Sequence, residues 1–436
     1  CQWSRTKRKI MKDSRYERSE KEFVRSLGVV SQGTTQSRTP SAFIPGAYPI
    51  FGQKGEGAHV WDIDGNSYVD WILSYGTIIL GHSHPSVNIA VKKEIDEGFA
   101  LPLTRLVQTE LAELLVDIIP CAEKLLFLKT GSEATSAAVR LARLATGRDK
   151  LVRLGYHGWH DWCVSRKAGT PKVVRDLTLT FKYNDLNTLD TVLKANKNEV
   201  ACIIMWPYEI ETPKPGFLEG VRDLAHHYGA LFILDEIRTG FHLAMGGAQE
   251  YFNVIPDLAT FGKAISNGYS ISVVAGRDEF MQNVRLSWFS STYNTNSIDQ
   301  AAALATINEM QQKNIIKHLW YIGKRLMVGL DELAESIGVE AKAVGLPPMP
   351  YLEFTYEQSN VLNTAKHVFF TETTKQGVLF HPHHHWFVCA SHGEKELLKT
   401  LEACEKGFHS VKAALDKGTL IQTTEAKSEG LEGGVI

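Results

Sequence analysis

LATFGKAISNGYSISVVAG (residues 258–276) is built from apolar and small polar residues and carries a single charged side chain, Lys263. A segment of this composition is expected to be buried, and an unpaired ammonium is costly to bury. One explanation is a lysine whose stem is buried while its tip reaches water. The other is a lysine whose nitrogen is bound covalently as a Schiff base. The residues elsewhere in the sequence that are expected to lie near Lys263 decide between these two explanations.

Short apolar runs alternate with amphipathic stretches on both sides of this segment. In 133–146, for example, Ala134, Ala138 and Leu141 share one helical face. Such alternation predicts an α/β fold with a mostly parallel central sheet sandwiched by helices. The runs expected as strands are LLFL (125–128), LVRL (151–154), CIIM (202–205), LFIL (231–234) and ISVVA (271–275).

A smaller α+β domain is expected from the two ends of the chain. HVWDIDGNSYVDW (59–71) alternates around Asp64-Gly65, which is typical of a hairpin. From about residue 300 helical patterns dominate, with few strands. We expect Met11 to be the natural start. The expected division is 1–85 (part of the small domain, its first 40 or so residues flexible), 86–297 (large domain), 298–416 (small domain) and 417–436 (disordered tail).

Composition excludes several classes of function. Apolar residues make up 44 % of the 436-residue chain and charged residues 22 %, as in soluble globular proteins. The net charge of −2 gives no reason to expect nucleic acid or a membrane surface as a partner. No apolar run approaches the roughly 20 residues that span a bilayer. Six scattered cysteines, without a CxxC pair, predict reduced thiols and a cytoplasmic location.

Polar residues follow two of the predicted strands. Gly131-Ser132 stands where a strand becomes a helix, with Ser132 as the expected N-cap, and such a helix entry can cradle a phosphate. The alternative is an ordinary turn in which Ser132 only caps. Asp235 follows LFIL directly and is expected to be buried with a cationic partner. On its own, Asp235 could equally be a salt bridge or a loop cap.

These features together fit the needs of pyridoxal phosphate. That cofactor requires an imine-forming lysine, an acid that keeps its pyridine nitrogen protonated, and a phosphate site. Lys263, Asp235 and Gly131-Ser132 supply these groups, each at the end of a strand. Ligands of open α/β sheets lie at the carboxyl ends of strands. The sequence therefore predicts a pyridoxal-phosphate site in which Lys263 forms the Schiff base.

At this point the chain resembles the class III pyridoxal-phosphate-dependent aminotransferases of fold type I, in particular the glutamate-1-semialdehyde 2,1-aminomutase branch. The resemblance runs from about residue 42 to 415. Ordered motifs carry it: WDIDGNSYVDW, GHSHP, GSEATSAAVRLAR, GRDK, YHGWHD, PGFLEGVRDL, LDEIRTGF, PDLATFGKAISNG and STYNTN.

The resemblance implies roles for the matching residues. Lys263 would bind the cofactor and move protons, and Asp235 would pair with the pyridinium nitrogen. Ile237 would pack under the ring, while Tyr156 would stack on its other face unless it is a core aromatic. Gly131 and Ser132 would bind the phosphate. Thr292 would reach the phosphate of a neighbouring subunit, which implies a homodimer with shared active sites, unless it is a turn residue of its own chain.

Other residues are candidates for substrate binding. Arg105 and Arg238 could clamp a carboxylate or phosphate, unless they are ordinary surface arginines. Tyr75 and Trp159 could line the pocket. HPHHH (381–385), with His383 as its candidate, replaces a glutamate-bearing loop of the aminomutase and favours a substrate or structural role. No metal site is expected there, since adjacent side chains diverge.

We expect an aminotransferase that moves an amino group from an amino-acid donor to a carbonyl acceptor. Departures from the aminomutase pattern are Trp206 where the family has glutamate, His242 where it has arginine, and a shorter segment between Tyr156 and Asn184. A 1,2-aminomutase or related isomerase is the first alternative, and a non-catalytic cofactor-binding protein is a remote one. The sequence does not identify the donor or the acceptor.

Overall fold

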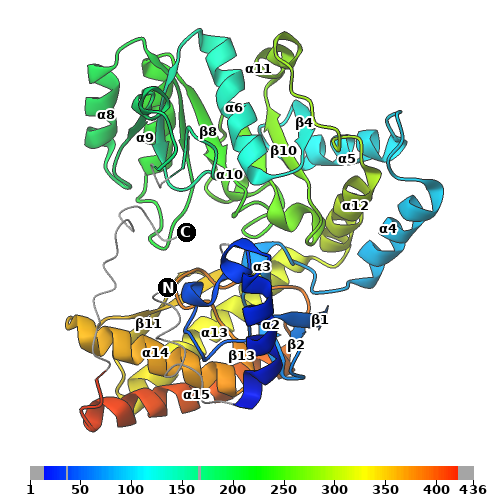
Figure 1. Cartoon of the computed structure of the whole chain (residues 1–436). Helices are drawn as coiled ribbons and strands as arrows, with labels where there is room; N and C mark the ends of the chain where they lie inside the picture. The colour runs from blue at the N-terminus through cyan, green and yellow to red at the C-terminus, as the bar shows by residue number, and fades with distance from the viewer. Residues whose placement is uncertain (1–13, 36–37, 165–167, 421–436) are drawn as a thin grey trace.

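A seven-stranded sheet organises the larger part of the protein and occupies the upper half of Figure 1. The computed structural model describes residues 14–35, 38–164 and 168–420. In the order β4-β10-β9-β8-β7-β5-β6, β10 is antiparallel to both neighbours, whereas the other adjacent pairs are parallel. The strands are β4 (Lys124–Leu128), β5 (Lys150–Leu154), β6 (Thr178–Thr180), β7 (Val200–Met205), β8 (Leu231–Asp235), β9 (Leu258–Phe261) and β10 (Ser272–Gly276).

Helices cover both faces of this sheet. In β7, Cys202 and Ile204 pack with the alanine-rich face of α6 (Gly131–Thr146). Ile203 and Met205 pack on the other face with α8 (Leu186–Ala195) and α9 (Phe217–His227). Successive strand residues point to opposite faces, so a strand buried on both sides is apolar throughout. The predicted α/β fold and its strands are confirmed.

The capping residue of α6 differs from the prediction. Thr130, not Ser132, is the N-cap: its hydroxyl accepts a hydrogen bond from the Glu133 backbone N–H (3.3 Å), and the Glu133 carboxylate accepts one from the Thr130 N–H (2.7 Å). This reciprocal pair is a capping box, whose T-x-x-E spacing is present in the sequence. Capping by Thr130 leaves the Ser132 hydroxyl available for other contacts.

The smaller unit joins segments from both ends of the chain. The expected hairpin forms, with β2 (His59–Asp62) antiparallel to β3 (Ser67–Asp70). β13 (Val378–Leu379) pairs in parallel with β3, and β1 (Gly52–Glu56) completes the four-stranded sheet. Around it lie α13 (Ile315–Ile337), α14 (Ser359–Lys375), α15 (Glu394–Asp416) and the hairpin of β11 (Ala341–Leu346) and β12 (Met349–Phe354), in the lower half of Figure 1.

Part of the N-terminal segment that was expected to be flexible forms helix α2 (Glu17–Leu27). The Asp64 carboxylate in the hairpin turn accepts hydrogen bonds from the backbone N–H groups of Arg18 (2.7 Å) and Ser19 (3.0 Å). An aspartate at the N-terminus of a helix satisfies amides that have no partner within the helix. The expected start, Met11, and residues 421–436 of the expected tail lie outside the described residues.

The remaining elements connect these two units. They are η1 (Ser14–Tyr16), η2 (Ser31–Gly33), η4 (Pro40–Ala42), α3 (Leu73–Gly76), α4 (Pro85–Glu97), α5 (Leu106–Ile118), α7 (Lys172–Asp176), α10 (Ala248–Tyr251), η5 (Lys263–Ser266), α11 (Asp278–Met281), η6 (Gln282–Leu286) and α12 (Ser297–Gln312). α12 packs on α4, α5 and η5, which ties the small unit to the Lys263 segment. The domain boundaries at 85/86 and 297/298 stay predictions.

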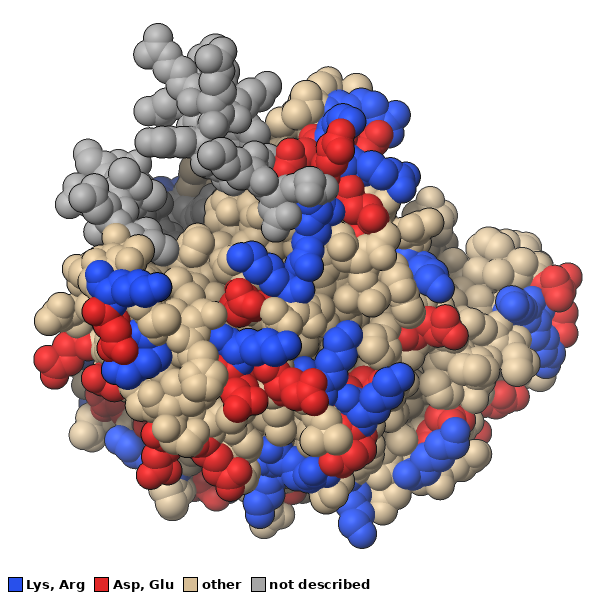
Figure 2. Space-filling view, turned by 90° about the horizontal axis from the view of Figure 1, so that it is seen from below, with Lys and Arg blue, Asp and Glu red and all other residues tan. Residues whose placement is uncertain are grey.

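The surface of the smaller unit mixes charges of both signs. Figure 2 shows this face with acidic and basic side chains interspersed. A protein face that binds nucleic acid concentrates lysine and arginine instead, to neutralise phosphates. Within the part of the chain that the structure describes, no helix combines the length and apolar character needed to cross a bilayer.

Candidate active site

The carboxyl ends of β4, β8 and β9 lie at one edge of the large sheet. β9 is parallel to β8, and β10 is antiparallel to both β9 and β4, so these three strands point the same way. Asp235 ends β8, Lys263 follows β9, and Gly131 begins the helix after β4. The fold therefore brings the three features that the sequence placed at strand ends to the same edge, where α/β sheets bind ligands.

Lys263 begins η5 in a strained backbone conformation, with φ of +46°. Left-handed backbone angles are unfavourable for residues with a side chain and are concentrated at functional sites. Its side chain is partly exposed and has no hydrogen bond or ion pair with any described residue. Burial, helped by the nearby Arg238 charge, lowers the pKa of the Lys263 amine to about 8. The neutral, nucleophilic amine is therefore accessible near physiological pH.

Asp235 is buried and held by three partners. Its Oδ2 lies 2.7 Å from His157 Nδ1, and its Oδ1 accepts hydrogen bonds from the Thr260 hydroxyl (3.2 Å) and the Ile237 N–H (3.1 Å). His157 Nε2 lies 3.0 Å from the Leu154 carbonyl. A carbonyl only accepts, so Nε2 carries a proton, and His157 holds the Asp235 carboxylate through Nδ1. His157 is thus the side chain that positions Asp235.

Sequence reasoning missed His157 as a functional residue. It lies in the YHG motif directly after Tyr156, but nothing in its local sequence identifies Asp235 as its partner, 78 residues away. The parallel pairing of β5 with β7 and of β7 with β8 brings the loop after β5 toward the end of β8. The contact between His157 and Asp235 therefore depends on the order of the strands in the sheet, and the YHG motif contains no information about that order.

An anion cradle lies at the start of α6. The first backbone N–H groups of a helix have no partner within it, and the helix dipole favours an anion there. The Ser132 hydroxyl accepts a hydrogen bond from the Trp159 backbone N–H (3.3 Å). A Cβ at Gly158, where φ is +113°, would lie 2.2 Å from Ser132 Oγ, so only glycine permits this approach.

Ile237 lies between the cradle and Lys263. A Cβ built on Gly131 would lie 3.2 Å from Ile237 Cγ2, and one on Gly262 would lie 3.0 Å from Ile237 Cδ1. Tyr156 is 38 % exposed, which argues against a core aromatic, and its backbone carbonyl accepts a hydrogen bond from Trp206 Nε1 (2.6 Å). An aliphatic side chain and an exposed aromatic ring thus flank the Lys263 region.

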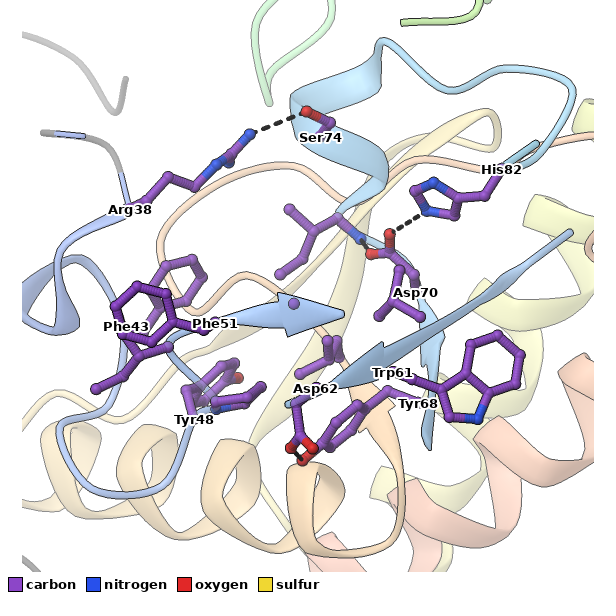
Figure 3. Close-up of a pocket in the computed structure, with 16 residues that line it drawn as sticks. Arg38, Phe43, Tyr48, Phe51, Trp61, Asp62, Tyr68, Asp70, Ser74 and His82 are labelled. Carbon is purple, nitrogen blue, oxygen red and sulfur yellow. Dashed lines mark hydrogen bonds and ion pairs between the residues drawn. The ribbon is translucent and has the colours of Figure 1, made fainter. Parts of the chain in front are cut away.

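Tyr75 is presented by a left-handed turn, α3 (Leu73–Gly76). The first three residues of α3 have φ between +46° and +61°, which is rare for side chains of this kind. Asp70 Oδ1 accepts hydrogen bonds from the N–H groups of Ile72 (2.9 Å) and Leu73 (3.0 Å), and Asp70 Oδ2 lies 2.8 Å from His82 Nε2. This network, visible in Figure 3, joins the hairpin motif to GHSHP and holds the turn in place.

The hollow in Figure 3 is distinct from the Lys263 region. It lies among the N-terminal segment 38–52, strands β2 and β3, and Leu379 of β13. Lys263, Asp235 and Gly131 are not among its lining residues. Arg38, which lines the hollow, donates a hydrogen bond to Ser74 Oγ (2.9 Å). Arg38 therefore helps to hold the turn that carries Tyr75.

The HPHHH stretch sends its side chains in different directions. His383 is exposed, whereas His381, His384 and His385 are buried. The Tyr75 hydroxyl lies 3.1 Å from His381 Nε2, and the Tyr75 ring packs edge-on against His384, with 5.1 Å between centroids. His383 was the predicted substrate residue, but its neighbours are the ones that face Tyr75. Within the described residues, no three potential metal ligands converge.

These inward histidines are uncharged near neutral pH. Burial lowers the pKa of His381 to about 3 and holds the pKa values of His384 and His385 well below the usual range. The positive charge of Lys263 also lowers the pKa of both His384 and His385. The wall that they form beside Lys263 is therefore polar but neutral.

The other predicted substrate residues separate into two groups. Arg238 is buried beside Trp206, with its guanidinium 4.5 Å from the indole centroid. Trp159 is 71 % exposed next to the α6 cradle. Arg105 pairs instead with Glu97 (2.5 Å) and Glu94 (3.2 Å) near the start of α5, so the structure does not place it with Lys263. Thr292 is exposed in the loop before α12.

Two departures from the family pattern are buried in this region. Trp206 packs under Arg238 and against Gly155, where a Cβ would lie 2.6 Å from the indole ring. His242 packs edge-on against Phe387, and burial lowers the pKa of His242 to about 4. Both substitutions replace a charged residue with one that is neutral at physiological pH.

Comparison with known proteins identifies the family. A family model described as aminotransferase class-III matches residues 44–415. This chain is a class III aminotransferase. It is 39 % identical over 401 residues to a 3-aminobutyryl-CoA aminotransferase from Cloacimonas acidaminovorans (strain Evry), an alignment that covers 90 % of this chain and 97 % of the relative.

Class III relatives of other named activities are also similar. A glutamate-1-semialdehyde 2,1-aminomutase from Desulforamulus reducens is 32 % identical over 425 residues, covering 91 % of this chain and 98 % of the relative. The solved structure of the Sphingopyxis sp. MTA144 FumI protein with pyridoxal phosphate superposes with a TM-score of 0.88 at 27 % identity, covering 93 % of this chain and 98 % of that one. The fold type I architecture predicted from the motifs is confirmed.

The residues present fit pyridoxal phosphate, the cofactor of this class III family. Lys263 Nζ has no partner among the described residues, the Asp235–His157 pair is buried beside it, and Gly158 keeps the start of α6 open to an anion. These are the three groups that the cofactor needs. The individual roles of the residues stay predictions.

The lowered pKa of Lys263 gives a pH prediction. Only the neutral amine attacks an aldehyde, and at pH 7 a group with a pKa of about 8 is roughly one-tenth neutral, against well under a thousandth for an ordinary lysine. We expect the rate at which cofactor-free protein captures pyridoxal phosphate to rise with pH and level off above about 8. Stopped-flow absorbance across pH 6–10 measures it. A rate that still rises steeply to pH 10 would contradict the assigned pKa.

Proposed function

We propose that Lys263, Asp235, His157 and the start of α6 form the reacting centre of this aminotransferase, which passes an amino group from an amino substrate to a carbonyl acceptor in two half-reactions. The observation that carries the proposal is the accessible, unpartnered Lys263 amine at the same sheet edge as the buried Asp235–His157 pair. A covalent lysine nitrogen and a fixed buried carboxylate are what amino transfer requires.

Each residue has one task in this scheme. Bound pyridoxal phosphate supplies an electron sink for the electron pair left when the amine-bearing carbon loses its proton. Lys263 Nζ holds the cofactor until the substrate amine displaces it, and then takes that proton. Asp235, supported by His157, would keep a proton on the ring nitrogen of the bound cofactor. The α6 amides and Ser132 hold the phosphate, and Ile237 and Tyr156 confine the ring.

The amino substrate that we propose is a 3-aminoacyl compound, with the amine two carbons from an acyl carbonyl. The similarity to a 3-aminobutyryl-CoA aminotransferase over 90 % of this chain supports it. The histidines His381, His384 and His385 are neutral, so these three side chains do not themselves favour a negatively charged donor over a thioester. The acceptor in this scheme is an oxo acid.

A half-reaction tests the proposal. Cofactor-loaded protein is mixed with 3-aminobutyryl-CoA alone, and the visible band of the Lys263-bound cofactor should disappear as one equivalent of the 3-oxoacyl product forms. Adding an oxo acid should restore the band and release an amino acid. If 3-aminobutyryl-CoA leaves the band unchanged while α-amino acids discharge it, the donor class is wrong.

The isomerase alternative has the same cofactor residues and a named relative at 32 % identity. An aminomutase moves the amino group within one substrate and needs no second carbonyl compound. The half-reaction separates the two, because an isomerase returns its cofactor to the starting form without an added acceptor. Conversion of glutamate-1-semialdehyde to an isomeric amino ketone, with no oxo product that has lost its nitrogen, would favour the isomerase.

We further propose a homodimer. Several large apolar side chains are exposed at the start of α5, at the end of η6 and in the loops beside them, namely Leu103 (72 %), Leu106 (80 %), Leu286 (64 %), Trp288 (87 %) and Tyr293 (67 %). The Ser297 N–H donates to the Phe99 carbonyl (3.2 Å), which ties the two loops together. A cluster of exposed apolar side chains of this extent is typical of an interface. A second copy of this chain would cover these apolar side chains. Thr292 of one subunit would then lie close to the start of α6 in the other subunit.

Thr292 gives the matching prediction. A hydroxyl that donates to a partner subunit's phosphate would be charge-assisted, so Thr292→Val is expected to weaken cofactor binding by roughly ten- to a hundredfold. Thr292→Ser, which keeps the hydroxyl, should bind almost normally. Cofactor titration measures this, and sedimentation should show a looser dimer without cofactor. A wild-type monomer with full cofactor affinity would exclude the shared site.

A cytoplasmic location is also a proposal. Five cysteines within the described residues are free and buried, namely Cys121, Cys163, Cys202, Cys389 and Cys404. Burial raises the pKa of each thiol, which suppresses the reactive thiolate. Such thiols are typical of proteins in a reducing compartment.

A further inference from the structure

Arg238 is a buried guanidinium without an ion pair among the described residues. It is 7 % exposed, and the groups that it contacts are neutral. It donates hydrogen bonds to the Tyr208 carbonyl and to His385 Nδ1 (3.4 Å), and it stacks on Trp206. Its Nε is buried without a hydrogen-bond partner. Burying a cation in this way is costly unless an anion compensates it.

His385 orients Arg238 but cannot compensate its charge. A guanidinium only donates, so His385 Nδ1 must accept, and the ring is neutral with its proton on Nε2. Burial and the Arg238 charge hold the pKa of His385 well below the usual range, and the nearby Glu209 carbonyl offsets this only in part. His385 is therefore a fixed acceptor for Arg238.

Arg238 also lies at the reacting centre. It is three residues after Asp235, directly after Ile237, and its charge helps to lower the pKa of Lys263. Glu209 and Asp235 attract it electrostatically, but neither pairs with it, and Asp235 is already engaged by His157. The positive charge of Arg238 is thus left without a carboxylate partner among the described residues, and its Nε has no acceptor there.

We propose that Arg238, positioned by His385 and Trp206, is the receptor for an anionic oxygen in the Lys263 site. This inference rests on the proposed function. Two sources present such an oxygen: the phenolic oxygen on the ring of pyridoxal phosphate and the carboxylate of the oxo-acid acceptor. Arginine binds either through charge-assisted hydrogen bonds. Trp206 and His242, which replace charged family residues, leave Arg238 as the buried cation at this position beside Lys263.

Two measurements that need no turnover distinguish the sources. The first is the pH midpoint of the visible band of the Lys263-bound cofactor. The second is the affinity of the loaded protein for succinate, a non-reacting carboxylate, by calorimetry. Both are made on wild type, Arg238→Gln, Arg238→Lys and the control Arg222→Gln. Arg222 is a partly exposed arginine on α9 that pairs with Asp223. Thermal unfolding confirms that each variant is folded, and Arg238→Lys keeps the test valid if the glutamine variant is not.

The expected results are specific to each source. If the cofactor oxygen is bound, Arg238→Gln raises the midpoint by about one pH unit, because loss of a cation favours the protonated form. Loss of the Arg238 charge near Lys263 raises the midpoint to some extent in either case, so succinate decides the second source: if the substrate carboxylate is bound, succinate binds about ten- to a hundredfold more weakly in Arg238→Gln, and if only the cofactor oxygen is bound, succinate binds as in wild type. Arg238→Lys gives a smaller effect in either case. Midpoint and succinate affinity that both match wild type in Arg238→Gln would overturn the proposal.

His385 is tested as a positioning residue. His385→Phe removes the hydrogen-bond acceptor of Arg238. Whichever measurement changes in Arg238→Gln, the midpoint or the succinate affinity, should change in the same direction in His385→Phe, but by less. In His385→Gln, whose amide oxygen can accept from the guanidinium, that measurement should return to the wild-type value. In the double variant Arg238→Gln/His385→Phe the two effects should not add, because His385 acts through Arg238. Additive effects, or no rescue by glutamine, would show that His385 only fills space.

The inference and the proposed function fail in different ways. If the protein transfers no amino group to any acceptor but its cofactor band still shifts in Arg238→Gln, the proposed reaction is wrong and the proposed anion receptor stands. If Arg238→Gln transfers amino groups normally and has the wild-type midpoint and succinate affinity, the proposed anion receptor is wrong and the proposed reaction stands.

Discussion

Lys263→Ala is expected to abolish the yellow Lys263-bound form of the cofactor and to lower turnover by at least about a thousandfold. The variant loses both the covalent nitrogen and the group that takes the substrate proton, and positioned acid–base catalysis alone contributes roughly 10²–10⁴-fold. Cofactor should still bind through the α6 cradle, because that contact does not involve Lys263. Absorbance at saturating cofactor and single-turnover rates measure both effects.

Reduction with borohydride locates the reactive lysine directly. Peptide mapping of reduced wild type should place the cofactor on Lys263 alone. Lys366 is the matched control, since it is also partly buried and burial lowers its pKa, but it lies on α14. A label on Lys366 would show that a lowered pKa alone makes a lysine reactive here, and a label anywhere except Lys263 would overturn the assignment.

Asp235→Asn is expected to leave the protein folded but to lower the rate of the half-reaction by about 10²–10³-fold. A neutral amide cannot keep a proton on the cofactor ring nitrogen, and loss of one preorganised electrostatic group costs about this much. His157→Asn should be milder, because the carboxylate remains and loses only its support. Single-turnover absorbance with saturating amino substrate separates this effect from weaker cofactor binding.

The chain contains a matched control for this variant. Asp257 is another buried aspartate next to a histidine, His226 (2.9 Å), but it precedes β9 and accepts a hydrogen bond from the Phe232 N–H at the start of β8. It therefore lies at the opposite edge of the sheet. Asp257→Asn should lower the melting temperature and spare the half-reaction. Equal kinetic loss in both variants would mean that Asp235 acts through stability.

Local sequence was sufficient for the framework of the site. The apolar runs, the amphipathic helices between them, and the lone Lys263 in its apolar segment are short-range patterns, set by side-chain periods of about 2 and 3.6 residues. They placed Gly131, Asp235 and Lys263 at strand ends before any contact was known. Where local prediction erred, as with Ser132 for Thr130 at the α6 N-cap, the competing T-x-x-E signal was only one or two residues away.

The N-terminal segment shows another limit of local sequence: residues 17–27 form helix α2, while the flexibility of the segment stays a prediction. The segment of α2 has mixed charge and little apolar character, and its helix depends on Asp64 in a distant hairpin turn. Likewise, His383 stood out as one of four histidines in five residues, but only packing shows that it points outward and that its neighbours face Tyr75. Composition and local period do not record which side of a loop meets the rest of the protein.

By itself, the sequence determined an α/β class III aminotransferase with Lys263 as the expected Schiff-base residue and Asp235 as its acid partner. Only the tertiary structure decided that His157 supports Asp235, that Tyr75 meets His381, and that Arg238 is buried without a carboxylate partner among the described residues. The reason is physical. Strand and helix formation depends on residues a few positions apart, whereas these contacts join segments far apart in the sequence, and strand order and packing bring them together.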